Sequence, residues 1–240
     1  MRVVISQPMY FPWLGQLNQA LLADAFVFYS DVQFARGFIN RVQILIDGQQ
    51  ELITVPTLGS KRSLINQLKI DYSQQWQKKH LAKIKQSFAN ASFKSQACSL
   101  FHQQVNKGHE NLSQLSSSTV ISLCEELFPE QCPMFFDSAD FPRQSKRTDS
   151  LLHICKELGA TKYLTGHGAA NYILVEQFDK AGIELEFIDY HIVTYPQLGG
   201  KHITPYVSSL DAFARLGSEK VIDLLKSGTI IANEFGRLTL

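Results

Sequence analysis

The chain has 240 residues, of which 45% are hydrophobic and 19% are charged, a balance typical of a folded domain and not of a disordered chain. Its 23 Lys and Arg residues nearly equal its 22 Asp and Glu residues, so the net charge of +1 excludes nucleic-acid or membrane binding through global charge. No apolar run reaches the roughly 18 residues that span a bilayer, and the apolar start is too short for a signal peptide, so we expect a soluble cytoplasmic protein.

The first thirty residues predict a strand, a loop, a helix and a second strand. Residues 2–6 form a short apolar run, and Pro8 and Pro12 delay any helix until about residue 14. The apolar spacing over 14–23 is helical, and residues 25–30 are rich in strand-forming types. Two buried strands joined by a helix are typical of a parallel sheet.

The next hundred residues predict a hairpin and then helices. Asp47-Gly48 separates two alternating apolar runs, which is a strong hairpin signal. Residues 73–91 carry a helical apolar stripe, and residues 95–128 also look largely helical, with Ser116 to Ser118 interrupting them. We therefore expect a largely helical subdomain near 73–130.

The last hundred residues return to alternating helices and strands. A helix beginning at Thr148 or Asp149 is followed by a strand at 162–166, and a helix ending near Gly182 is followed by a strand at 183–190. The whole chain, residues 1–240, therefore predicts one α/β domain. Its mostly parallel Rossmann-like sheet would carry a β-hairpin and a helical insertion.

Two polar loops follow the first two predicted strands. In open α/β sheets ligands bind at the carboxyl ends of strands, so Gln7, Tyr10 and Trp13 are candidate binding residues, and Gly15 would allow close approach. The alternative is a rigid Pro-Trp loop that plugs the sheet edge. Asp31, Gln33, Asn40 and Arg41 follow the second strand; Asp31 suits a general base or hydroxyl acceptor, and Arg41 suits a phosphate or carboxylate. The alternative there is a capped turn with a surface arginine.

A third loop, TGHGAANY, follows the strand at 162–166. Backbone amides near Gly166 and Gly168 could hold an anion, whereas His167 is as compatible with an ordinary loop position as with catalysis. Neither the histidines nor the four cysteines have the spacing of metal ligands, so we expect no metal site and free thiols. The basic stretch 61–94 indicates either a polyphosphate or nucleic-acid patch or an ordinary solvated face.

Over nearly its whole length the chain resembles the WbqC-like family. The resemblance rests on ISQPMYFPWLGQLNQA, FVFYSDVQFARGFINRVQI, LLHICKELGATKYLTGHGAANY, VTYPQLGG and ITPYVSSLDAFARLG. It implies a bacterial cytoplasmic protein of O-antigen or related surface-polysaccharide biosynthesis. The positions that match the family are Gln7, Pro12, Trp13, Gly15, Asp31, Gln33, Asn40, Arg41, Thr148, Asp149, Gly166, Gly168 and Tyr172.

Together these features lead to a functional hypothesis. The protein would be an enzyme that transfers an acyl or aminoacyl group to a nucleotide-linked amino sugar. Asp31 and Gln33 would be catalytic. The substrate would be bound by Gln7, Tyr10, Trp13, Gly15, Asn40, Arg41, Thr148, Asp149, Gly166, Gly168 and Tyr172. The alternative is a non-catalytic protein that binds sugar nucleotides or a glycan-assembly complex. The sequence identifies no cofactor and predicts no specific nucleic-acid partner and no membrane span.

Overall fold

The computed structural model describes residues 1–60, 62–142, 147–166, 173–197 and 204–232. Six of its strands form the central sheet, in the order β10-β9-β8-β1-β2-β7. All adjacent strands run parallel except β10, which is antiparallel to β9. The six strands are β1 Arg2–Ser6, β2 Ala25–Phe28, β7 Met134–Asp137, β8 Lys162–Gly166, β9 Glu184–Tyr190 and β10 Thr229–Ala232. The prediction of an α/β fold with a mostly parallel sheet is thereby confirmed.

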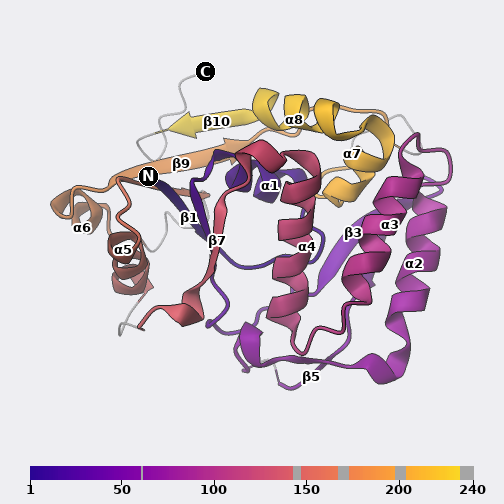
Figure 1. Cartoon of the computed structure of the whole chain (residues 1–240), viewed down its shortest axis with the longest axis horizontal. Coiled ribbons are helices and arrows are strands. Elements are labelled where there is room, and N and C mark those ends of the chain that lie inside the picture. The colour runs from indigo at the N-terminus through magenta and orange to yellow at the C-terminus, as the bar shows by residue number, and fades with distance from the viewer. Residues whose placement is uncertain (61, 143–146, 167–172, 198–203, 233–240) are drawn as a thin grey trace.

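Helices cover both faces of this sheet (Figure 1). Side chains alternate along a strand, so Val4 of β1 packs into the core on the side of α1, whereas Val3 and Ile5 pack into the core on the side of α5 and α6. The described helices are α1 Leu14–Leu22, α2 Trp76–Ser87, α3 Lys94–Val105, α4 Leu112–Leu127, α5 Arg147–Glu157, α6 Val175–Lys180, α7 Ser209–Leu216 and α8 Ser218–Ser227.

The predicted hairpin is confirmed as a separate antiparallel pair. Strands β3 (Arg41–Ile46) and β4 (Gln49–Thr54) are joined by Asp47 and Gly48, which have φ values of 49° and 78°. Positive φ at both turn residues is what a two-residue hairpin of matching twist requires. The short strands β5 (Thr57–Leu58) and β6 (Lys69–Ile70) form a second small pair.

The helical interruption expected at Ser116–Ser118 is wrong, because α4 runs through it. The hydroxyl of Ser116 donates to the carbonyl of Ile39 at 2.7 Å, and that of Thr119 accepts from the backbone N–H of Phe11 at 2.9 Å. Hydroxyl side chains weaken a helix when they compete for its own backbone. Here they hold neighbouring loops against α4.

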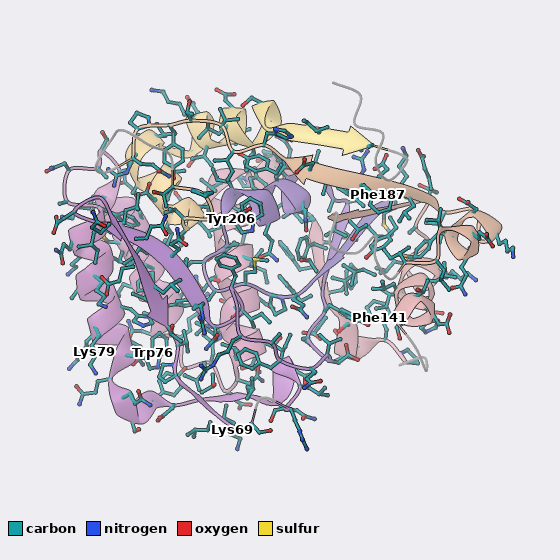
Figure 2. All side chains as sticks on the ribbon, turned by 180° about the vertical axis from the view of Figure 1, so that it is seen from behind. Lys69, Trp76, Lys79, Phe141, Phe187 and Tyr206 are labelled. Carbon is teal, nitrogen blue, oxygen red and sulfur yellow. The ribbon has the colours of Figure 1, made fainter. Side chains whose placement is uncertain are left out.

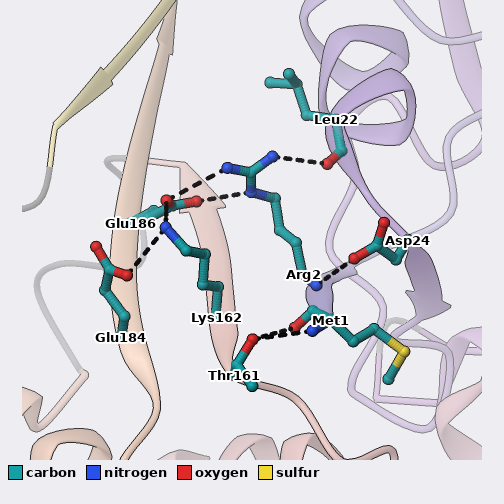
Figure 3. A network of polar contacts seen from close by, with 8 residues as sticks. All are labelled: Met1, Arg2, Leu22, Asp24, Thr161, Lys162, Glu184 and Glu186. Atoms are coloured by element: carbon teal, nitrogen blue, oxygen red, sulfur yellow. Dashed lines mark hydrogen bonds and ion pairs between the residues drawn. The ribbon is translucent and has the colours of Figure 1, made fainter.

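A network of charges ties three parallel strands together at the amino edge of the sheet (Figure 3). Glu186 of β9 accepts from Arg2 Nε of β1 at 2.7 Å and from Lys162 Nζ of β8 at 2.7 Å. Lys162 also pairs with Glu184 at 2.9 Å. Burial alone raises the pKa of Glu186, but the hydrogen bonds and charges of Arg2 and Lys162 outweigh burial and lower it.

Candidate functional site

The carboxyl ends of the parallel strands form the opposite edge of the sheet. Strand β1 leads through α1 to β2 on one side, whereas β8, on its other side, is reached only after β7. The strand order therefore reverses between β1 and β8, and ligands of open α/β sheets bind in the crevice beside such a reversal. The register places Phe28 beside both Ser6 and Asp137. This edge is consequently the expected position of a substrate site.

Gln7 directly follows β1 and Gly166 ends β8, the two strands that flank the reversal. The side chain of Gln16, in the first turn of α1, donates to the Ser6 hydroxyl at 3.2 Å and to the Gln7 carbonyl at 2.7 Å. Its Oε1 is buried and has no hydrogen-bond partner among the described residues. A Cβ at Gly166 would lie 3.4 Å from Nε2 of Gln19. The structure thus brings Gln7 and Gly166 to neighbouring strand ends.

Asp31 and Asp137 are linked by a reciprocal exchange of hydrogen bonds. The Ser138 hydroxyl donates to Asp31 Oδ1 at 2.5 Å, and the Ser30 hydroxyl donates to Asp137 Oδ1. The Ser30 backbone N–H also donates to the Ser138 hydroxyl at 3.0 Å. Both serines are buried, whereas both aspartates are half-buried. Two carboxylates are therefore fixed at the ends of the adjacent strands β2 and β7 and remain partly open to solvent.

The predicted site residues of the C-terminal half of the chain lie in different parts of the structure. Gly166 ends β8 and Asp31 lies three residues beyond β2; only β1 separates these strands, so their ends lie roughly 10 Å apart. Thr148 and Asp149 lie in the first turn of α5, where Thr148 is buried and Asp149 is exposed. Three further residues of the third loop lie outside the described residues, namely His167, Gly168 and Tyr172.

Gln33 and Asn40 lie on the segment that connects β2 to the hairpin. Gln33 is exposed and pairs with Leu64 in an isolated β-bridge. Asn40 is buried, and its Nδ2 donates to the Val55 carbonyl at 3.2 Å. The position of Asn40 therefore indicates a structural role at the base of the hairpin, whereas Gln33 is accessible beyond Asp31.

Arg41 begins β3 and so lies on the hairpin, not on the central sheet. Val42 and Ile44 of this strand are buried in the core, which leaves Arg41 and Gln43 on the opposite face. The side chain of Gln43 donates to the Pro205 carbonyl at 3.1 Å. The Nε of Arg41 is buried and lacks a partner among the described residues. Arg41 is thus a cation beside the segment that follows residue 204.

Tyr10 is fully buried, which removes it from the set of residues that can stack on a ligand. Its hydroxyl lies 3.1 Å from Nδ1 of His80, and its ring makes edge contacts with Phe11 and Trp76. Burial raises the pKa of this tyrosine well above its ordinary value. The structure therefore places Tyr10 in the core, where its hydroxyl is matched by a histidine.

Trp13, in contrast, is only half-buried and stands at the start of α1. Its ring centroid lies 5.0 Å from that of Tyr206 and 6.1 Å from that of Tyr190, both at 69°. A Cβ on Gly15 would lie 2.1 Å from Cη2 of the Trp13 indole. Gly15 therefore provides space for the indole, and not for the close approach of a ligand that we expected.

A pocket opens beside Trp13. It is lined by Trp13, Leu14, Ile192, Tyr195, Gln197, Thr204, Tyr206 and Val207. Behind it, the Tyr195 hydroxyl donates to Asp211 at 3.1 Å, and Arg215 donates to the same carboxylate at 3.0 Å. Burial raises the pKa of Asp211 despite the opposing effect of Arg215, and burial together with Asp211 raises the pKa of Tyr195. A buried network thus supports the polar wall of the pocket.

The described residues contain no group of three or more His, Cys, Asp or Glu side chains that could hold a metal ion. Within the same residues, no helix is long and apolar enough to cross a membrane. The four cysteines are free, and Cys124 and Cys155 are buried. Burial raises the pKa of Cys155 to about 12, which makes this thiol a poor nucleophile.

Comparison with known proteins supports the resemblance found in the sequence. The model of the WbqC-like protein family matches residues 7–223. A Mycobacterium tuberculosis protein named "Uncharacterized protein Rv1507c" is 30% identical over 223 residues, which cover 91% of this chain and 95% of that protein. No solved structure gives a significant match. The chain therefore belongs to the WbqC-like protein family.

Proposed function

We propose that this protein is an enzyme of bacterial surface-polysaccharide biosynthesis that transfers an acyl or aminoacyl group to the amine of a nucleotide-linked amino sugar. Membership of the WbqC-like family supports the link to polysaccharides. The observation that carries the proposed chemistry is the pair of carboxylates, Asp31 and Asp137, held by Ser30 and Ser138 at the carboxyl edge of the parallel sheet.

In the proposed reaction the amine nitrogen attacks the carbonyl carbon of an activated acyl donor. The new C–N bond forms as the bond to the donor's leaving group breaks, and that group departs with the electron pair. Asp31 accepts the proton that the amine loses, which a carboxylate within hydrogen-bond reach can do. Ser138 fixes one oxygen of Asp31, so the carboxylate is oriented before substrate binds.

The other predicted residues serve binding in this proposal. Gln33, exposed two residues beyond Asp31, positions the acyl donor through its amide. Arg41 holds the diphosphate of the nucleotide, because its side chain is only half-buried and a guanidinium suits phosphate oxygens. Gln7 and Gly166, at the ends of β1 and β8 beside the reversal of strand order, contact the substrate in this proposal.

The test is a product assay by mass spectrometry. Wild-type protein is incubated with UDP-linked amino sugars and with either acyl-coenzyme A or an amino acid plus ATP. We expect an amide product, and at least about 100-fold slower turnover in Asp31→Asn, the usual size for loss of an acid/base group. Asp140→Asn, an exposed acid in the same region, is the matched control and should keep full turnover. Unchanged turnover in Asp31→Asn would remove Asp31 from this role.

A second candidate function is a non-catalytic protein that binds a sugar nucleotide. The uncharged lining of the pocket beside Trp13 favours it, because recognition of a neutral ring needs no acid or base. Binding of a sugar nucleotide by calorimetry, together with no product from any donor, would support this function over the enzyme.

A further inference from the structure

We infer that Cys124 and Cys132 form a reversible disulfide in response to peroxide, and that this bond restrains the start of β7. The inference goes beyond the proposed reaction, because neither thiol takes part in it. The thiol of Cys124 donates a hydrogen bond to the sulfur of Cys132. Cys124 is fully buried, whereas Cys132 is half-buried and open to a small oxidant. A partly exposed thiol beside a second, resolving thiol is the arrangement of redox-sensing cysteines.

The chain brings the two thiols together by turning between α4 and β7. Cys124 lies in the last turn of α4, where its carbonyl accepts from the N–H of Phe128 at 2.9 Å. A short 3-10 helix follows at Pro129–Gln131, and Cys132 comes directly after it. Figure 1 shows the chain turning at the end of α4 and running back as β7. Both cysteines pack into the same apolar core, so the turn holds their sulfur atoms in contact.

The surroundings make Cys132 the attacking thiol. The hydrogen bond from Cys124 lowers the pKa of Cys132, although its partial burial opposes the shift. Burial raises the pKa of Cys124 well above its ordinary value. Cys98 is also half-buried, but burial raises its pKa despite the charges of two neighbouring lysines. Because the thiolate is the nucleophile, peroxide should react at Cys132 before Cys98.

The proposed oxidation has two steps, with hydrogen peroxide as the oxidant. The Cys132 thiolate attacks one peroxide oxygen, the O–O bond breaks, and the departing hydroxide takes up the proton that the thiol released. This leaves a sulfenic acid on Cys132 and one water. The sulfur of Cys124 then attacks the sulfur of Cys132, and the S–O bond breaks. The hydroxide leaves with the electron pair and the Cys124 proton as a second water, so two thiols are oxidised and one peroxide is reduced.

The disulfide would restrain the less firmly held end of an edge strand. β7 is the outer strand of the described sheet and pairs with β2. At the far end of β7, Asp137 binds Ser30, and Phe141 packs into the core beside α5 (Figure 2). At its near end Met134 is 55% exposed. Cys132 lies two residues before Met134, so a bond to α4 fixes the position at which β7 begins.

Peptide mapping by mass spectrometry tests the bond directly. Reduced protein is treated with hydrogen peroxide, and the remaining thiols are alkylated before digestion. Trypsin releases Cys124 and Cys132 in one peptide, because residues 108–142 contain no Lys or Arg, whereas Cys98 and Cys155 fall in other peptides. We expect the shared peptide to lose two hydrogen atoms and to escape alkylation, and dithiothreitol to restore both thiols. Glutamates lie between the two cysteines, so cleavage there should give fragments joined only by the disulfide.

Variants separate the two steps. Cys124→Ala should stop at the sulfenic acid of Cys132, which dimedone traps, and Cys132→Ser should give neither product. Cys98→Ser removes another half-buried thiol and is the matched control, which should form the disulfide as the wild type does. Mapping of the wild type decides whether the bond forms even where a variant folds poorly.

Hydrogen exchange tests the restraint on the strand. The backbone amides of residues 132–137 should exchange more slowly in the oxidised protein than in the reduced protein, and dithiothreitol should reverse the change. The amides of α2, at the other end of the molecule, should exchange equally in both (Figure 1).

Two results would overturn the inference. The first is oxidation of Cys98, or further oxidation of Cys132 to its sulfinic acid, without linked fragments, which would show that Cys124 does not resolve the sulfenic acid. The second is a disulfide that leaves the exchange of β7 unchanged, which would show that the bond does not restrain the strand. Neither readout depends on amide formation, so failure here is distinct from failure of the proposed function.

Discussion

His80 is a titratable side chain placed in the core of the protein. It lies against Tyr10 and Trp76, and burial lowers its pKa from 6.5 to about 4, because the imidazolium loses its hydration. The charge of Lys83 lowers this pKa further, and a hydrogen bond with the backbone of Thr54 opposes the shift. The neutral imidazole is therefore part of the native packing under the loop that carries Trp13.

This burial predicts a pH-dependent stability. The unfolded chain binds a proton at His80 near pH 6.5 and the native protein only near pH 4, so the free energy of unfolding should fall as the pH decreases through this interval. The full contribution is on the order of 3 kcal/mol. Urea unfolding at several pH values should show this loss in the wild type. An equally steep loss in His80→Gln would assign it to other groups.

Among single residues, Asp31 could be predicted from the sequence, whereas Asp137, the second carboxylate of the pair, could not. Asp31 directly follows a recognisable strand. Because ligands of open α/β sheets bind at the carboxyl ends of strands, the sequence identifies Asp31 as a candidate site residue. Asp137 lies at the end of a four-residue strand, and only the position of β7 beside β2 gives it significance. Tyr195, Gln197 and Tyr206 lie in segments that match the family, but tertiary contacts alone bring them to Trp13.

At the scale of elements, the start of α1 illustrates a conflict between helix propensity and packing. Gly15→Ala should favour the helix by up to about 1 kcal/mol. The added Cβ would however overlap the Trp13 indole, the movable end of a side chain. We therefore expect the variant to fold with a displaced indole, seen as red-shifted tryptophan emission.

Gly37→Ala is the control for this prediction. The nearest atom to a Cβ at Gly37 is 4.0 Å away, and its φ lies outside the left-handed range, so this change should leave the emission unaltered. Normal emission in Gly15→Ala would show that the indole does not need the space above Gly15.

Elements with strong local patterns were predicted well, and elements that depend on context were not. The strand at 2–6, the helix beginning at Leu14 and the hairpin turn at 47–48 all match the structure, because apolar spacing and turn chemistry are local. Strands β7 and β10 have only four residues each, and a run that short does not distinguish strand from loop. Helix α4 continues through three serines, and two of them, Ser116 and Ser118, donate to Ile39 and Gln104 outside the helix and not to its backbone.

At the scale of the whole molecule, the two edges of the sheet differ: the amino edge carries a charge network, and the carboxyl edge carries the candidate site. Glu186, buried at the amino edge, binds both Arg2 and Lys162, whereas Glu184 is more exposed and pairs with Lys162. Loss of one partner from a buried charge cluster costs up to about 3–5 kcal/mol, and partial exposure of the two cations reduces this here.

We therefore expect Glu186→Gln to lower the free energy of unfolding by about 1–3 kcal/mol near neutral pH, and Glu184→Gln to lower it by less than about 1 kcal/mol. The pKa of Glu186 is lowered on folding, so its contribution is present above the ordinary pKa of 4.5 and is lost as the pH falls below it. Chemical denaturation measures both effects. Folded Glu186→Gln should form the amide product as fast as the wild type. Slower turnover would show that the charge network at the amino edge affects the candidate site at the carboxyl edge.

The exchange between Ser30–Asp31 and Asp137–Ser138 also has a consequence for biosynthesis. Its partners are separated by 107 positions in the chain. Contacts between such distant segments form late, because a long loop must close before they gain any stabilisation. A nascent chain can pair β1 with β2 soon after both emerge from the ribosome. Asp31 then lacks the hydrogen bond from Ser138 until β7 has been synthesised and has joined the edge of the sheet.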